Sequence, residues 1–345
     1  MARNVDLRSD TVTLQPEAMK EAMIKAKVGD EYYDGDPTII ELQELAAEML
    51  GKEAGLFVAS GTMGNLVGIL SQTQRGDEVI EETDSHSFRC EGGNFAVAGG
   101  VLSKQIKGHL GAMDPADIEA AIPPKGYGYP IASLILIENT HNAAGGTCIT
   151  PKQMAEYRKI ADKYGLNIHV DGARIFNAAV ALGVKPSELA KDADTLSFCL
   201  SKGLACPFGG VLVGAKEILS RARNYKQMVG GGFRQLGYMA ACGIYALNNM
   251  VDRLAEDHKN ARLLADGLAE LGMDVEMESV QTNMAYFKVP PSLIDANEFS
   301  EKINSRKGIQ MNPPKKNRIR LVTHYGIEKE DVEYFLSKAK DVLND

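Results

Sequence analysis

Short apolar runs alternate with amphipathic helical stretches between about residue 36 and residue 214. This alternation is typical of parallel strands joined by crossover helices, so the sequence predicts an α/β sheet. The apolar runs that we expect to form strands are 56–60, 133–140, 166–174, 195–202 and 209–214.

Two predicted helices have clear ends. Asp36 can cap a helix whose apolar residues recur at helical spacing, with Pro37 suited to the first turn and Gly51 to the end. A second helix, over 151–165, likewise begins with proline and ends with glycine. Each helix follows or precedes one of the predicted strands, as a crossover connection requires.

The pattern changes beyond about residue 216, where the helices lengthen. Residues 251–271 predict one long amphipathic helix, and the rest of the chain alternates between short strands and helices at 284–289, 298–308, 318–324 and 329–343. At 345 residues the chain exceeds the usual size of a single core. We therefore expect a large domain over 1–250, which includes the N-terminal segment, and a small α+β domain over 251–345.

Composition narrows the function classes. Hydrophobic residues make up 44% and charged residues 24%, a balance typical of globular proteins. No apolar run approaches the ~20 residues of a membrane span, and the start of the chain has no apolar signal core. The five scattered cysteines show neither disulfide nor zinc spacing, so we expect a reducing cytoplasm and no metal. A net charge of −8 without a basic stripe makes nucleic acid an unexpected partner and a small molecule the expected one.

Ligands of open α/β sheets bind beyond the carboxyl ends of the strands, so polar residues that follow the apolar runs are the candidates. SGTMGN (60–65) follows one such run. Gly61 permits close approach of a ligand, Thr62 offers a hydroxyl, and the free N–H groups of a helix start bind phosphate. The alternative is a purely structural turn, because such turns need glycine anyway.

Asp171, in HVDGAR (169–174), ends another apolar run. A carboxylate buried there needs a cationic partner, and the pyridinium nitrogen of pyridoxal phosphate is one. The alternatives are an ion pair with Arg174 or a helix cap.

Lys202 directly follows the run 195–201 and precedes a glycine-rich segment. With one strand-and-helix unit between them, Lys202 and Asp171 are expected at the same edge of the sheet, where a lysine is a competent Schiff-base amine. Taken alone, Lys202 would be an ordinary surface lysine. His86, just past the run 78–83, has two interpretations: a residue that stacks on a cofactor or moves protons, or a satisfied loop residue.

Seven segments extend this set in order along the chain: VDLRSDTVT (5–13), SGTMGN (60–65), IENTHN (137–142), HVDGARIFNA (169–178), LSKGL (200–204), GGGFRQ (230–235) and RLVTH (320–324). Together they resemble the L-threonine aldolase family of the low-specificity type. The resemblance implies the aminotransferase-like fold (fold type I), with a mostly parallel sheet in the large domain and a smaller C-terminal α+β domain. It also implies a pyridoxal 5'-phosphate enzyme that cleaves L-threonine or L-allo-threonine to glycine and acetaldehyde, assembled as a homotetramer with shared active sites.

For the cofactor, the resemblance implies specific roles. Lys202 matches the lysine that carries pyridoxal phosphate as a Schiff base, and Asp171 the partner of the ring nitrogen. Gly61 and Thr62 match the phosphate site, and His86 the histidine that stacks on the ring.

For the substrate and the oligomer, the resemblance assigns further residues. Arg174 matches an arginine near the cofactor's phenolic oxygen and the substrate carboxylate, and Ser9 and Arg320 match the other carboxylate contacts. Tyr33 and Arg234 match residues that family members lend across a subunit boundary.

The chain departs from the family pattern at two places. Gln227 stands where relatives often have a lysine that contacts the phosphate across subunits, with Lys226 one place earlier. Gly128 stands where some members have a second active-site histidine, which leads us to expect weak discrimination between the two threonine epimers. A β-eliminating lyase or an aminotransferase of the same fold is the alternative function, since it would keep Lys202 and Asp171.

Overall fold

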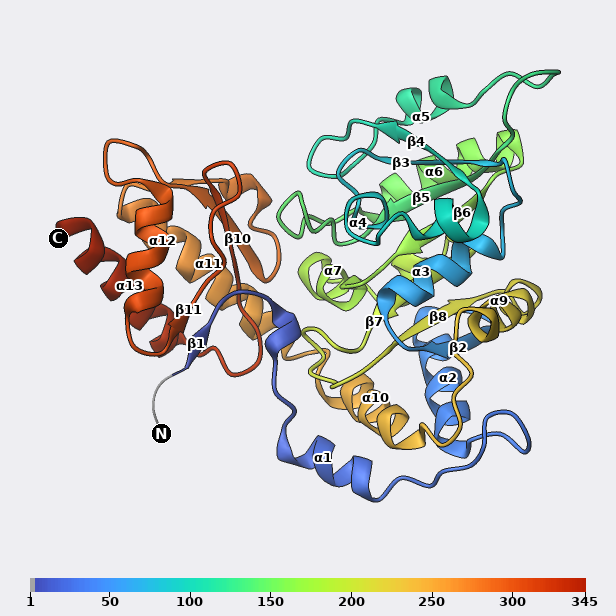
Figure 1. Cartoon of the computed structure of the whole chain (residues 1–345), viewed down its shortest axis with the longest axis horizontal. Helices are drawn as coiled ribbons and strands as arrows, with labels where there is room; N and C mark the ends of the chain where they lie inside the picture. Colours follow the sequence, from blue (N-terminus) through green and yellow to red (C-terminus); the bar gives the residue numbers. More distant parts are fainter. Residues whose placement is uncertain (1–3) are drawn as a thin grey trace.

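The computed structural model describes residues 4–345, which form a larger part on the right of Figure 1 and a smaller part on the left. The buried apolar side chains of these residues form a main cluster in each part. Helix α11 (Leu254–Glu270) connects the parts, because Leu254 packs in the first cluster and Leu264 in the second. The expected domain division between residues 250 and 251 stays a prediction.

A seven-stranded sheet forms the centre of the larger part (Figure 1). Its spatial order is β2 (Ala54–Val58), β8 (Gly210–Gly214), β7 (Thr195–Cys199), β6 (Asn167–Asp171), β5 (Ala132–Glu138), β3 (Glu78–Glu82) and β4 (Leu102–Ile106). Only β8 runs against the others, pairing antiparallel with both β2 and β7. The expected mostly parallel sheet is confirmed.

Helices cover both faces of this sheet, so its strands are apolar on both sides. Ile135 and Ile137 of β5 belong to the large cluster with helices α2, α6, α7 and α10, whereas Leu134 and Leu136 pack on the opposite face, near α3. The helices of this part are α1 (Glu17–Ile24), α2 (Pro37–Leu50), α3 (Gly61–Leu70), α4 (His86–Arg89), α5 (Pro115–Ala121), α6 (Pro151–Tyr164), α7 (Ile175–Leu182), α8 (Pro186–Ala190), α9 (Lys216–Met228) and α10 (Gly237–Asn249).

The two helices with predicted ends form as expected. Asp36 caps α2 by accepting the N–H groups of Thr38 and Ile39, and Gly51 ends it in the left-handed conformation. Helix α6 begins with a capping box between Thr150 and Gln153.

The smaller part is a three-stranded antiparallel sheet with three helices. The strands lie in the order β12 (Arg318–Val322), β10 (Met284–Lys288) and β9 (Asp274–Val275). Helices α11, α12 (Ala296–Ser305) and α13 (Lys329–Asn344) pack with them around the second cluster.

The beginning of the chain differs from expectation. Strand β1 (Val5–Asp6) pairs in parallel with β11 (Ile309–Gln310), and Val5 and Leu7 belong to the second cluster. In Figure 1 the blue strand β1 accordingly lies among the red C-terminal elements. The chain then crosses to the larger part, where α1 packs on α10, so the N-terminal segment ties the two parts together.

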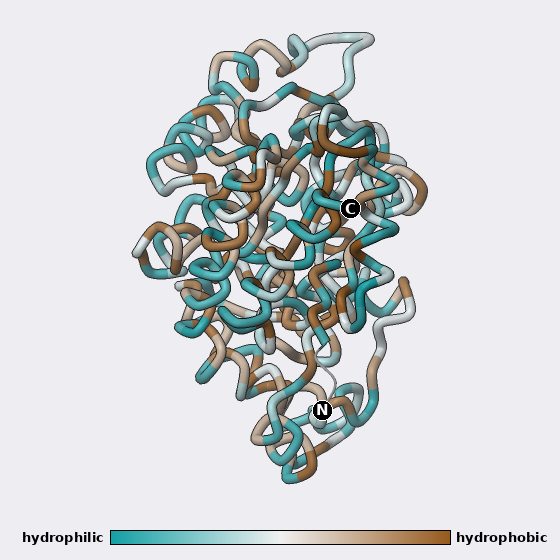
Figure 2. The backbone as a smooth tube through the Cα atoms, turned by 90° about the vertical axis from the view of Figure 1, so that its left-hand side faces the viewer, coloured by the Kyte–Doolittle hydropathy of each residue, from teal (hydrophilic) through white to brown (hydrophobic). Residues whose placement is uncertain are grey.

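Figure 2 shows polar and apolar colours alternating along the helical turns, as amphipathic helices require. Across residues 4–345 we find no helix both long and apolar enough to cross a membrane.

Candidate active site

Functional side chains gather at the carboxyl edge of the large sheet. Asp171 is the last residue of β6, where it lies beside Glu138 of β5 and Ser197 of β7 in the strand register. Lys202 follows β7 by three residues and is partly exposed. Its ammonium makes no hydrogen bond or ion pair with any residue of the described chain, so it remains free to react.

Asp171 is a buried carboxylate, 2% exposed, that lacks a lysine or arginine partner among residues 4–345. It accepts the backbone N–H of Ala173 at 3.1 Å. The alternative ion pair with Arg174 is wrong, because the Arg174 guanidinium turns to Asp10 instead. A buried anion without a cation is costly, so this position fits the protonated nitrogen of a pyridinium ring.

Asp10 and Arg174 form a buried two-pronged ion pair. Nε and Nη2 of Arg174 each donate to one carboxylate oxygen of Asp10 at 2.7 Å. Burial alone would raise the pKa of Asp10, but the charge and hydrogen bonds of Arg174 hold that pKa well below its usual range. Lys202 also acts electrostatically on Asp10, which places Lys202 and Arg174 around the same carboxylate. Nη1 of Arg174 is not used by this pair and can bind another oxygen.

His86 begins the short helix α4, directly after β3. Its backbone N–H donates to Glu138 at 2.7 Å, and its ring Nδ1 lies 3.0 Å from Oε1 of the buried Glu91. The hydrogen bond to Glu91, with the charges of Asp171 and Glu138, raises the pKa of His86 despite its partial burial. Ligand atoms of His86, Glu91 and Asp171 lie within 4.8 Å of one another, so these three side chains could hold either a metal ion or one edge of a cofactor ring.

The start of α3 serves packing and also leaves N–H groups free that could bind an anion, so the phosphate site expected at SGTMGN stays a prediction. The N–H groups of Gly61 and Thr62 have no partner in the described chain, while Ser60 caps Met63. A Cβ on Gly61 would lie 2.5 Å from Sγ of Cys199, so only glycine lets α3 approach β7 this closely. The helix start therefore lies at the same sheet edge as Lys202, as a phosphate site should.

Arg320 reaches the site from strand β12. Nη1 donates to Oδ1 of Asn142 at 2.7 Å, and Nη2 donates to the carbonyl of Arg8 at 3.1 Å. Asn142 is held in turn by Glu138, which accepts its backbone N–H at 2.8 Å. Ser9 lies next in sequence to both Arg8 and Asp10, and its hydroxyl caps the short helix that Asp10 begins. Glu138 thus connects the His86 side of the site with the Arg320 side.

Tyr33 and Arg234 lie together in a separate group. Tyr33 is 78% exposed and packs edge-on against Tyr32, whose ring carries the Arg234 guanidinium 5.5 Å from its centre. The structure brings neither residue into contact with the Lys202 group within one chain. Lys226 is buried beside them, and Glu31 binds its ammonium at 2.6 and 2.9 Å.

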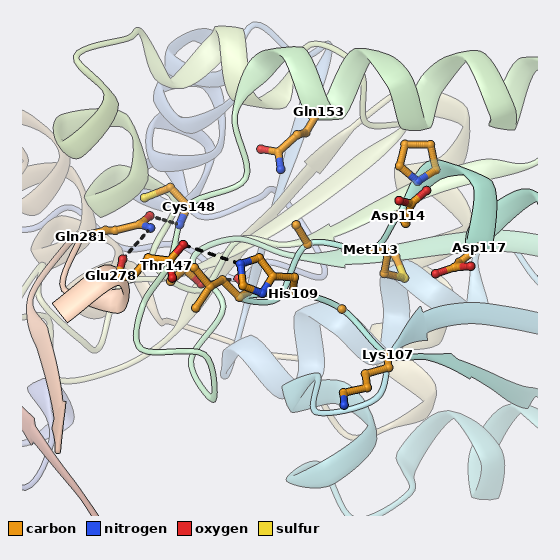
Figure 3. A pocket seen from close by; sticks show the side chains of 14 residues that line it. Lys107, His109, Met113, Asp114, Asp117, Thr147, Cys148, Gln153, Glu278 and Gln281 are labelled. Carbon is orange, nitrogen blue, oxygen red and sulfur yellow. Dashed lines mark hydrogen bonds and ion pairs between the residues drawn. The ribbon is translucent and has the colours of Figure 1, made fainter. Parts of the chain in front are cut away.

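A hollow of about 650 Å³ lies apart from these groups, between the loop after β4 and the small part (Figure 3). None of the predicted site residues lines it. Its His109 is exposed and lies 3.6 Å from Glu278, while burial raises the pKa of the Cys148 thiol to about 12. This thiol is therefore a poor nucleophile.

Sequence reasoning did not single out three residues that the structure places at the carboxyl edge of the large sheet, namely Asp10, Glu91 and Glu138. Asp10 and Glu138 lie inside segments that carry the family resemblance, so their motifs offered a signal. Glu91 had none, because it lies outside every such segment. The completed group combines a free amine, a buried anion, an anion-binding helix start and two arginines, which suits an amino acid bound to pyridoxal phosphate.

Comparison with known proteins gives a family. The model described as "Beta-eliminating lyase" matches residues 6–290. An Arabidopsis thaliana protein, "Probable low-specificity L-threonine aldolase 2", is 43% identical over 347 residues, covering 99% of this chain and 98% of its own. "Low specificity L-threonine aldolase" of Escherichia coli (strain K12) is 40% identical over 329 residues, covering 95% and 96%.

Solved structures share the fold. A Leishmania major threonine aldolase superimposes with a TM-score of 0.83 at 20% identity, over 98% of this chain and 99% of its own. A Sphingomonas wittichii serine palmitoyltransferase gives 0.76 at 17% identity, over 98% and 87%. The expected aminotransferase-like fold of type I is confirmed.

Proposed function

The chain belongs to the beta-eliminating lyase family, and we propose that within it the protein is a pyridoxal-phosphate aldolase that cleaves L-threonine and L-allo-threonine to glycine and acetaldehyde. The resemblance to low-specificity L-threonine aldolases is confirmed by relatives 43% and 40% identical over nearly the whole chain. One structural observation supports the proposal most: among residues 4–345, neither a lysine nor an arginine pairs with the buried Asp171, and Lys202, also unpaired there, emerges at the same sheet edge. An anion and an amine so placed suit the two ends of this cofactor's reactive ring.

The residues of the edge fit the cofactor. Lys202 would bond its aldehyde carbon, Asp171 would hold its ring nitrogen protonated, and the N–H groups of Gly61 and Thr62 would bind its phosphate. His86 would lie against the ring, because its side chain reaches within 4.8 Å of Asp171. When bound, pyridoxal phosphate withdraws electrons from the substrate's α-carbon.

The chain's own residues select which bond breaks. Arg174 through its unused Nη1, Arg320 and Ser9 would hold the substrate carboxylate, and this hold would orient the Cα–Cβ bond for cleavage. Cleavage also requires that a base remove the proton of the β-hydroxyl. His86 would accept it, since its ring is partly exposed at this edge.

Tyr33 and Arg234 support a shared site. Both are exposed and lie apart from the Lys202 group, as residues lent to a neighbouring subunit should. We propose a homotetramer in which Arg234 contacts the neighbour's cofactor phosphate. Lys226 would not take this role, because Glu31 holds its ammonium.

We expect the enzyme to accept both configurations at the substrate's β-carbon, and this expectation rests on Gly128. It lies in an exposed loop before β5, at the opposite edge of the sheet from Asp171. Within one chain it offers no side chain to the β-hydroxyl, so both threonine epimers should react.

The five free cysteines favour a reducing cytoplasm, which fractionation of cells would test.

A product assay separates this function from its alternatives. Purified enzyme with L-threonine should release acetaldehyde and glycine in equal amounts. Pyruvate from serine or cysteine as the main product would indicate a β-eliminating lyase, and a keto acid formed only with an amino acceptor would indicate an aminotransferase. Either outcome would overturn the proposal.

A further inference from the structure

A chain of buried hydrogen bonds runs from His86 into the sheet. Oε1 of Glu91 lies 3.0 Å from Nδ1 of His86 and 2.9 Å from Nδ2 of Asn65. Oδ1 of Asn65 in turn accepts from Ser197 and lies 3.2 Å from Nε2 of His169. Glu91, Asn65 and His169 are at least nine-tenths buried. Their hydrogen bonds are therefore electrostatically stronger than they would be in water.

The acceptor oxygen of Asn65 determines where the proton of His169 lies. Burial lowers the pKa of His169 to about 4, so its ring is neutral and carries a single ring proton. Oδ1 of Asn65 can only accept, and it lies 3.2 Å from Nε2 of His169, so Nε2 must carry that proton. Nδ1 then accepts from the hydroxyl of Thr195 at 2.7 Å, and the same hydroxyl oxygen accepts from Gln72 at 2.7 Å. His169 therefore keeps its proton on Nε2 and donates to Asn65. The Asn65 amide must then turn its NH₂ toward Glu91.

Glu91 is consequently surrounded by donors. Asn65 donates to Oε1, and Asn94 donates to Oε2 at 3.0 Å. The side-chain oxygen Oδ1 of Asn94 accepts the backbone N–H of Phe95 at 2.6 Å, so the side-chain amide of Asn94 cannot flip. An ionised carboxylate can only accept, which leaves one role for Nδ1 of His86.

We propose that Glu91 is a positioning residue that keeps the proton of His86 on Nδ1 and so presents Nε2, with its lone pair, to the β-hydroxyl of the substrate. Nε2 forms no hydrogen bond within the described chain, and the His86 side chain is 32% exposed against 1% for Glu91. Nε2 is thus the ring nitrogen left free for the substrate. The bond from the His86 backbone N–H to Glu138 fixes the other end of the residue. The inference rests on the proposed function for what Nε2 acts on, but the proton position itself does not.

The tautomer can be observed without turnover. Holoenzyme labelled with nitrogen-15 in its six histidines gives distinct signals for protonated and unprotonated ring nitrogens, and a His86→Phe variant assigns the His86 signals. We expect a protonated Nδ1 and an unprotonated Nε2 above the pKa of His86. A protonated Nε2 would overturn the proposal.

Two variants of Glu91 separate positioning from packing. In Glu91→Gln the amide oxygen can still accept from His86 and Asn65, so the tautomer should persist. The charge is lost, however, and the pKa of His86 should fall, although Asp171 and Glu138 still face it. In Glu91→Ala nothing holds Nδ1–H, so Nε2–H should appear and kcat/KM should fall by about 10²-fold or more. An unchanged tautomer in Glu91→Ala would contradict the role of Glu91.

The pH profile supplies a second readout. Protonation of Nε2 removes its lone pair, so kcat/KM should fall as the pH drops through the pKa of His86, which lies above the usual 6.5. This acid limb should move to lower pH in Glu91→Gln and stay in place in Asp84→Asn, a control that removes an exposed carboxylate from the same segment. An acid limb that does not move in Glu91→Gln would contradict the proposal. If the predicted tautomer is found in a protein that does not cleave threonine, only the proposed function fails.

Discussion

At the scale of single residues, the ion pair between Asp10 and Arg174 is the contact that the sequence hides best. The two residues are 164 positions apart, and no local sequence pattern predicts such a pair. The strand ends did reveal Asp171 and Lys202, because an apolar run followed by a polar residue is a local signal. The sequence offered Asp171, the nearest carboxylate, only as an alternative partner for Arg174, and the true partner, Asp10, was not considered.

Loss of the Asp10 carboxylate should destabilise the protein strongly. Asp10→Ala leaves the Arg174 guanidinium buried and unpaired, at a cost of about 3–5 kcal/mol in the free energy of unfolding. Urea unfolding measures this loss. The double variant Asp10→Leu/Arg174→Met should lose less than the single variant, and an equal or greater loss would contradict the account. Since the pKa of Asp10 is lowered on folding, the stabilisation is present above the unfolded pKa of about 3.9 and is lost as the pH falls below it.

Asp171→Asn tests the electrostatic role of the buried carboxylate. A neutral amide cannot hold a pyridinium nitrogen protonated, so kcat should fall by about 10²-fold or more. Asp117→Asn, an exposed aspartate on α5, should leave kcat unchanged. Activity of Asp171→Asn within a few-fold of the wild type would reduce Asp171 to a structural role.

At the scale of elements, helix ends were predictable and strand directions were not. Caps such as Asp36 and Thr150 act within a few residues of sequence, so α2 and α6 could be located to within a residue or two. Strand β8 runs against its neighbours, but its apolar pattern would be the same in either direction. Strand β4 was not predicted at all, because much of its surface is polar and exposed.

Helix α3 is the element whose placement depends most on glycine. Gly61, Gly64 and Gly68 lie on the side that meets β6 and β7, where a Cβ would come within 2.5–3.0 Å of a sheet side chain. Gly61→Ala should push the helix start away from the sheet and weaken binding of pyridoxal phosphate by about tenfold or more, equivalent to ~1.4 kcal/mol. Fluorescence titration of apoenzyme with the cofactor measures this affinity. Thr62→Ser keeps the hydroxyl and should bind normally, whereas wild-type affinity in Gly61→Ala would show that the close approach is unimportant.

At the scale of the whole molecule, the division of site residues into two separate groups predicts complementation. Lys202→Ala and Arg234→Ala subunits should each be nearly inactive alone. In a mixed oligomer, one site would combine Lys202 of one subunit with Arg234 of its neighbour, so co-expression should restore activity. Absence of recovery, together with a fully active monomer in sedimentation, would contradict shared sites.

The preference for one of the two threonine epimers also depends on the whole molecule. Because no side chain at position 128 reaches the carboxyl edge within one chain, the ratio of kcat/KM for L-threonine and L-allo-threonine should stay below about 10², or roughly 2.7 kcal/mol. Steady-state kinetics with both epimers measures it. A larger ratio would mean that another residue, from this chain or a neighbour, binds the β-hydroxyl selectively.

The most direct test of the account is to find the residue that carries the cofactor. Borohydride reduction of the holoenzyme fixes pyridoxal phosphate to its lysine, and mass spectrometry of the digested protein then locates it. We expect the modification on Lys202, at the carboxyl edge beside Asp171. A modification confined to another lysine, or none in a catalytically active preparation, would contradict it.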